Sequence, residues 1–230
     1  MTNEVDLGTL HHELVTGLLG RGCCPSHTDL AETLGIGSDD LSERLRDLEA
    51  IHGVVLHPDV DEPWLVHPFS TTPTLNYVES ERGSWWAPCL WCAFGVATLV
   101  GGHCRIHTRY GAEAEPLVID VAGGVPVNQR EVVVHFAVPP ARAWENVHRH
   151  CALVLPFRSA REIGAWCARH GVTMGEAVRL EQVALLAMAW YGDHANPQWR
   201  KWSVTEAQAL FHGAGLNSSF WDLPVASGKF

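Results

Sequence analysis

The residues best suited to chemistry in this sequence are its seven cysteines, two of which, Cys89 and Cys92, form a C-x-x-C pair. A deprotonated cysteine is a good nucleophile and the soft ligand that proteins offer to soft metal ions. The cysteine count is odd, and the first residues show neither the basic nor the apolar region of a secretory signal. We therefore expect a cytoplasmic protein with free, catalytic or metal-binding thiols, because disulfide frameworks belong to oxidising compartments.

The C-x-x-C pair is open to more than one interpretation. A redox dithiol sits where a helix opens, which fits here, but it also needs a strand–helix–strand unit that the sequence does not show. Zinc is a second option, because Cys89, Cys92, His103 and His107 follow a C-x2-C-x10-H-x3-H pattern. However, the ten residues between Cys92 and His103 are mostly apolar and predict a helix. At a rise of about 1.5 Å per residue, this helix would place His103 far from the two cysteines. Each cysteine can also be simply a small buried apolar residue.

A buried helix is expected to carry Cys92. The apolar run from Trp86 to Gly101 predicts this helix, with a start near Ala87-Pro88, because proline is tolerated in a first helical turn. Cys151 falls in a short apolar run, 151–155, that predicts a strand. The other strands and helices of this part are expected at 105–108, 117–121, 131–137, 160–170, 174–190 and 205–211.

The N-terminal part has the element order of a winged helix. Apolar spacing predicts helices at 7–19, 27–34 and 38–51, and two short β stretches follow at 54–57 and 64–67. The third helix would read DNA, yet it carries five acidic and two basic residues, and the chain has a net charge of −10. Phosphates repel such a helix. We therefore expect a structural module and no nucleic-acid partner.

Together these elements predict an α+β fold, in which an N-terminal winged-helix-like helical module precedes a mixed α/β catalytic domain with a small, mostly antiparallel sheet. We place the module at 1–68, the catalytic domain at 69–216 and a C-terminal tail at 217–230. The longest apolar stretches, 91–100 and 183–190, fall far short of the roughly 20 residues that span a bilayer. No membrane association is therefore expected.

Four segments together resemble the organomercurial (alkylmercury) lyases: HPFSTTPT at 67–74, WCAFG at 91–95, HCRIHTRYGAEAEPLVIDV at 103–121 and HCALVLPFRSAREIGAW at 150–166. That family has two essential cysteines, one in a W-C-A helix and one in a later segment that a tryptophan follows fifteen residues on. By this resemblance the pair is Cys92 and Cys151, and Cys104 matches a third, structural cysteine. The family carries an acid, or in some members serine, three residues after the first cysteine, where this chain has Gly95.

The resemblance implies protonation of a carbon–mercury bond, with release of a hydrocarbon and Hg(II) held by Cys92 and Cys151. It implies no cofactor, a small organomercurial as substrate, and low-molecular-weight thiols or a mercuric reductase as agents that remove the metal. Because the glycine side chain carries no acidic proton, we expect one of the two thiols to donate its own proton as it binds the metal, with His103, His150 or a bound water as candidates that assist. The residues that can support the pair, with Gly95 itself, are Cys89, His103, His150 and Trp86.

The missing acid leaves two alternative functions. The chain can be a lyase-like enzyme turned to another carbon–heteroatom or carbon–metal bond, or a non-enzymatic thiol protein that binds a metal. A Gly95→Asp variant that gains activity would support the hypothesis that the missing acid separates this chain from the family.

Overall fold

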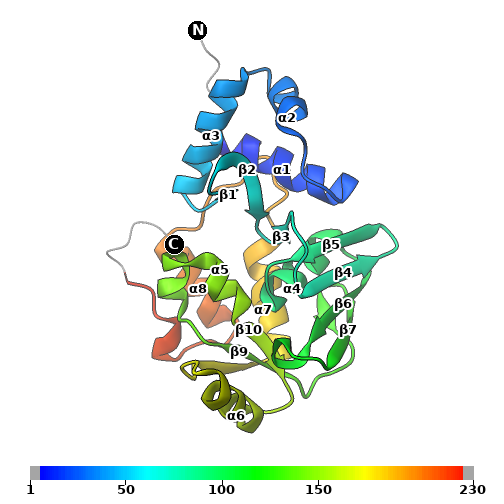
Figure 1. Cartoon of the computed structure of the whole chain (residues 1–230), viewed down its shortest axis with the longest axis vertical. Coiled ribbons are helices and arrows are strands. Elements are labelled where there is room, and N and C mark those ends of the chain that lie inside the picture. Colours follow the sequence, from blue (N-terminus) through cyan, green and yellow to red (C-terminus); the bar gives the residue numbers. More distant parts are fainter. Residues whose placement is uncertain (1–5, 225–230) are drawn as a thin grey trace.

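Three helices form one end of the molecule in the computed structural model, which describes residues 6–224 (Figure 1). They are α1 (Leu7–Arg21), α2 (His27–Leu34) and α3 (Ser38–Ala50), and they confirm the three helices expected here. Ser26 begins α2 by accepting a hydrogen bond from the backbone N–H of Asp29.

The sheet that follows runs from this end into the rest of the chain. Strands β1 (Val55–His57) and β2 (Val60–Val66) pair with each other, and β3 (Phe69–Ser70) pairs with β2. The strand order is β1-β2-β3-β5-β4-β6-β7-β8, and the neighbouring strands are antiparallel. The expected antiparallel sheet is confirmed, and the boundary proposed at residue 68 falls within it.

Strands β4 (Asn76–Ser80) and β5 (Gly83–Ala87) were not expected from the sequence. The sequence predicts that Trp86 belongs to the following helix, but the structure places it in β5. There the side chains point alternately to the two faces of the sheet, so Trp85 is buried and Trp86 is 37 % exposed. Such alternation is the period of a strand with one buried face. The other strands of this sheet are β6 (His103–Arg109), β7 (Pro116–Ala122) and β8 (Val125–Pro126).

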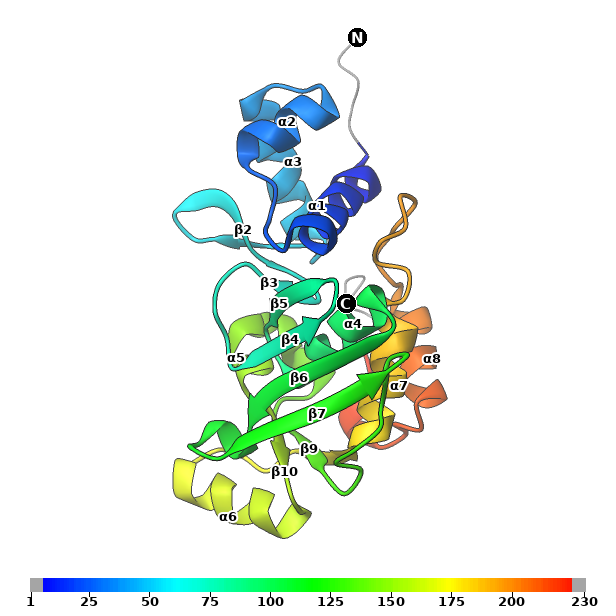
Figure 2. The same ribbon diagram turned by 90° about the vertical axis from the view of Figure 1, so that its right-hand side faces the viewer.

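Two long helices meet beside this sheet (Figures 1 and 2). Helix α4 (Leu90–Val100) is buried along most of its length and packs against α7 (Leu180–Tyr191). The predicted buried helix is therefore confirmed, although it begins later than expected because β5 extends through Ala87.

A second, three-stranded sheet corrects two predictions. Its antiparallel order is β10 (Val154–Phe157), β9 (Val133–Phe136), β11 (Glu176–Arg179). Cys151 is not on a strand but near the end of a short helix, α5 (Val147–Ala152). The helix expected over 174–190 begins only at Leu180, because the residues before it pair with β9 instead.

The last elements pack against these sheets and helices. Helix α6 (Ala160–His170) has the predicted bounds, and α8 (Val204–Gly213) covers the short helix predicted nearby. Short 3₁₀ helices lie at Tyr110–Ala112, Pro140–Glu145 and Ser219–Trp221.

The segment expected as a tail, 217–230, contributes to the core. The side chain of Trp221 is fully buried against Phe136 and Phe211, whereas residues 225–230 lie outside the described part. Among residues 6–224, no helix has both the length and the apolar character that crossing a bilayer requires.

Candidate active site

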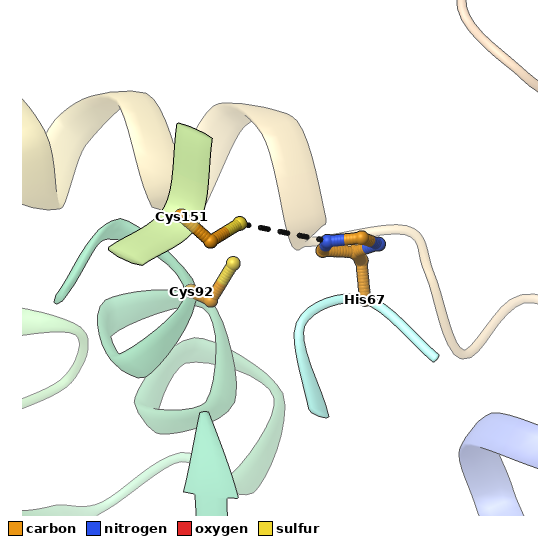
Figure 3. A group of neighbouring side chains, drawn as sticks. All are labelled: His67, Cys92 and Cys151. Carbon is orange, nitrogen blue, oxygen red and sulfur yellow. Dashed lines mark hydrogen bonds between the residues drawn. The ribbon is translucent and has the colours of Figure 1, made fainter. Parts of the chain in front are cut away.

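Cys92 and Cys151, far apart in the sequence, meet in the structure together with His67 (Figure 3). Their two sulfurs and one imidazole nitrogen all lie within 4.8 Å of one another. Cys92 comes from α4, Cys151 from α5, and His67 from the turn between β2 and β3. A metal–thiolate bond measures about 2.3 Å for zinc, so one ion placed between the sulfurs can bind both.

The start of α4 positions Cys92. Cys89 is the N-cap residue of this helix, and its sulfur accepts a hydrogen bond of 3.3 Å from the backbone N–H of Cys92. Both thiols therefore lie at the positive end of the helix dipole, where a thiolate is stabilised. The C-x-x-C spacing thus serves to cap the helix: Cys89 caps α4, and Cys92 lies in its first turn, at the site.

The three thiols Cys89, Cys92 and Cys151 differ in the direction in which the site shifts their pKa values. Burial alone would raise the pKa of Cys89, but hydrogen bonds from Cys151 and Cys92 outweigh it and lower that pKa well below its usual range. Burial raises the pKa of Cys92 well above its usual range, and hydrogen bonds to Cys89 and Cys92 do the same for Cys151. The hydrogen bonds among the three sulfurs therefore favour a thiolate on Cys89 over one on Cys92 or Cys151.

Tyr191, the last residue of α7, occupies the space beside Gly95. A Cβ atom built on Gly95 would lie 2.3 Å from Cδ2 of Tyr191 and 2.8 Å from Cβ of Pro68, so no larger residue fits without displacing its neighbours. The Tyr191 hydroxyl lies 3.3 Å from the sulfur of Cys92. Glycine at position 95 thus lets a tyrosine from another helix reach the first thiol.

His67 is a neutral imidazole at the site. Its Nε2 lies 3.9 Å from the sulfur of Cys151. Burial, assisted by the positive charge of Lys201, lowers the pKa of His67 to about 4. A neutral imidazole has a free lone pair, so His67 can bind a metal ion or accept a proton at neutral pH.

A cavity of about 50 Å³ opens beside the two thiols. Trp91, Val147 and Trp190 give it apolar walls. It lies where α1 and the 192–203 loop, which rises beside α1 in Figure 2, meet the rest of the chain. A mainly apolar cavity next to thiols suits a small organic group.

The supporting residues expected from the sequence are only partly at this site. His150 lines the cavity, and burial lowers the pKa of its ring, so it is neutral and not a charged acid. Trp86 does not line the cavity, and its exposed side chain contacts Tyr77 instead.

The zinc pattern is wrong as a metal site. His103 is exposed at the start of β6, and His107 pairs with Glu79 at 3.1 Å. Among the described residues, the group of possible metal ligands that contains Cys92 includes neither histidine. Cys104 is buried and its thiol donates to the Gly101 carbonyl, 3.7 Å away.

The residues that the sequence reasoning missed come from distant segments. His67 is the first residue of the HPFSTTPT segment, one of the segments that resemble the family, so the sequence contains a signal for this residue. Tyr191 contacts Cys92 across 99 positions of sequence, and no local pattern indicates such a contact.

A buried pair of thiols beside a neutral imidazole, in an α+β fold with an adjoining apolar cavity, is an arrangement compatible with the binding of a soft metal ion. The chain belongs to the alkylmercury lyase family, whose model, MerB, matches residues 69–192.

A solved structure shares the fold. It is described as the crystal structure of the mercury-bound form of MerB2, and it matches with a TM-score of 0.61 and 19 % sequence identity, covering 80 % of this chain and 88 % of that one. The comparison with curated proteins finds no match.

Proposed function

We propose that this chain cleaves the carbon–mercury bond of small organomercurials by protonolysis, releasing a hydrocarbon and retaining Hg(II) on Cys92 and Cys151. The observation that carries the proposal is the approach of these two sulfurs to within 4.8 Å beside an apolar cavity. Membership of the alkylmercury lyase family supports it, and so does the preference of mercury for thiolates.

The first step is capture of the mercurial by Cys92. The substrate arrives as R–Hg–X, where X is a thiolate that carries it. The sulfur of Cys92 bonds mercury, X leaves with its electron pair, and the Cys92 proton passes to Cys89, whose lowered pKa makes it the acceptor. The N-terminus of α4 and the Tyr191 hydroxyl stabilise the Cys92 thiolate as it forms.

The second step is protonolysis by Cys151. Its raised pKa keeps this thiol protonated until mercury approaches. Its sulfur then bonds mercury while its proton goes to the carbon, so that the C–Hg bond breaks and R–H leaves. Two Hg–S bonds replace the Hg–C and Hg–X bonds, and no acid at position 95 is required.

Release of the metal requires competing ligands. His67, with its nitrogen near both sulfurs, can hold Hg(II) as a third ligand. Low-molecular-weight thiols in excess, or the thiols of a mercuric reductase, then exchange for Cys92 and Cys151.

The test is hydrocarbon release by the purified chain. Incubated with phenylmercuric acetate and excess thiol, it is expected to release benzene, one molecule for each mercurial consumed, as measured by gas chromatography. A Cys23→Ser variant, which loses an exposed thiol outside the site, serves as the matched control and should keep the activity.

Two other outcomes would contradict the proposal. Stoichiometric binding of mercury without benzene would favour a thiol protein that only stores or senses the metal. If neither binding nor release occurs, the result would favour a lyase-like enzyme that acts on another carbon–heteroatom or carbon–metal bond.

Tyr191 is expected to act as a positioning residue for Cys92. Tyr191→Phe keeps the ring against Gly95 but removes the hydroxyl that lowers the pKa of Cys92. Loss of this hydrogen bond should reduce the rate about tenfold. Because the thiolate of Cys92 then forms at higher pH, the loss should be largest at low pH and the rate–pH profile should shift upward.

The matched control is Tyr77→Phe, which removes a hydroxyl on β4 away from the cavity and should leave the profile in place. If the profiles of Tyr191→Phe and the unmodified chain superimpose, the hydroxyl has no part in positioning Cys92.

A further inference from the structure

The cavity contains a buried lysine, Lys201, that forms no ion pair with a carboxylate among the described residues, and burial lowers the pKa of Lys201 to about 7. Lys201 lines the wall, where its Nζ donates a hydrogen bond of 3.2 Å to the His52 carbonyl and lies 4.8 Å from the centre of the Trp144 ring. Neither partner carries a negative charge. No described residue forms an ion pair with Lys201, although the chain has 26 acidic residues.

The groups around Lys201 are neutral hydrogen-bonding side chains. His11 and His194 are almost completely buried, and burial lowers the pKa of both rings, that of His11 to about 3. All three side chains line the same cavity, and the ring centroids of His11 and His194 are 5.5 Å apart. No described residue that lines this cavity is aspartate or glutamate.

The two histidines also have unused hydrogen-bonding capacity. In each of them the buried Nδ1 has no hydrogen-bond partner among the described residues. Buried polar atoms are rarely left unpaired, and both rings belong to residues that line the cavity, where a ligand can supply the missing partner. A carboxylate suits this wall, because its negative charge favours the protonated form of Lys201 and its oxygens accept up to four hydrogen bonds from ammonium and imidazole N–H groups.

We propose that Lys201, His11 and His194 form a carboxylate-binding subsite, which takes mercurials that carry a carboxylate either on the organic group or on the thiol bound to the metal. The subsite and the thiols Cys92 and Cys151 line the same cavity, so a single small molecule can reach both. This inference rests on the proposed function for the identity of the ligand. It adds a specificity that the thiol pair alone does not supply.

The test compares two complexes that differ in one group. Methylmercury is supplied with either 3-mercaptopropionate, which carries a carboxylate, or 2-mercaptoethanol, which carries a neutral hydroxyl. The chain should show a KM about tenfold lower for the carboxylated complex, as expected for one charge-assisted hydrogen bond.

Variants of Lys201 test whether this residue causes the preference for the carboxylated complex. Lys201→Met keeps the length of the side chain and should bring the two KM values together, whereas Lys201→Arg should keep them apart. Arg130→Met removes an exposed cation that does not line the cavity, and it is the matched control for the change in net charge.

A second pair of substrates separates the two sources of the carboxylate. Phenylmercury and its para-carboxylated analogue, both supplied with 2-mercaptoethanol, place the carboxylate on the organic group. A preference in this pair but not in the thiol pair assigns the subsite to the organic group, and the reverse result assigns it to the carrier thiol.

Equilibrium dialysis with mercury analysis makes the result independent of turnover. If no hydrocarbon forms but the carboxylated complex still binds about tenfold more tightly, the proposed function fails and the subsite stands. Equal affinities for carboxylated and neutral complexes in the unmodified chain would overturn the subsite even if cleavage is efficient, and this comparison needs no variant to fold.

Discussion

Replacing Cys92 with serine lowers the rate of hydrocarbon release at least about a thousandfold, because the serine hydroxyl is neither a nucleophile at neutral pH nor a soft ligand. The serine hydroxyl is also a much weaker acid than a thiol, so it does not pass its proton to Cys89 when the mercurial is captured. Serine is nearly isosteric with cysteine, and the α4 cap is made by the Cys89 sulfur and the Cys92 backbone, so the fold should be retained.

The same change at Cys151 should stop the reaction at a different point. Cys92 can still take the R–Hg group, but the second ligand and the proton for carbon are both missing. We expect the R–Hg adduct on the Cys151→Ser variant to be visible by mass spectrometry of the intact protein, with no hydrocarbon released. The double variant should be hardly slower than either single variant, because residues that act as a unit give non-additive losses.

Cys23→Ser is again the matched control, since its thiol is exposed and outside the site. A Cys151→Ser variant that kept more than about a tenth of the activity would mean that another group protonates the carbon, and the two-step mechanism would have to be abandoned.

The elements that local patterns define were predictable from the sequence. The spacing of leucines in α3 and the serine caps of α2 and α6 fix those helices by interactions within a few residues. The residues before Leu180 show the limit of such patterns, because their pairing with β9, some forty positions away, determines that they form a strand. Cys151 likewise lies on α5, capped by Asn146, although its apolar neighbours favour a strand.

The residues of the candidate site also differ in whether a local pattern or a long-range contact determines their role. Cys92 and Cys151 could be identified because they lie in short family segments, each interpretable on its own. His67, Tyr191 and Lys201 could not be assigned, because what gives them a role is contact with residues 84, 99 and 149 positions away. Burial sets their protonation states, and burial is a property of the assembled chain.

Gly95→Ala is expected to destabilise the fold by ~1–3 kcal/mol or more, because its Cβ would overlap the ring of Tyr191. Gly164→Ala is the matched control. Gly164 also lies inside a helix, α6, but a Cβ there would meet no atom within 4 Å. The control should gain up to ~1 kcal/mol from the better helix propensity of alanine. Chemical denaturation of both variants measures the difference, and equal shifts would contradict the contact between Gly95 and Tyr191.

The contact also changes what a restored acid at this position should do. Gly95→Asp alone is expected to lose stability and activity rather than to gain activity, because the new side chain competes with Tyr191 for the same space and displaces its hydroxyl from Cys92. Tyr191→Ala alone should also lose activity, since it removes the hydrogen bond and leaves a cavity.

Combined, the two changes should compensate each other. The space vacated by the tyrosine ring admits the aspartate, whose carboxyl then lies one helical turn from Cys92. We expect the double variant to be more stable and more active than the sum of the single effects predicts, with a coupling energy of at least ~1 kcal/mol. Additive losses would show that Gly95 and Tyr191 are independent, and that the tyrosine does not take the place of the acid.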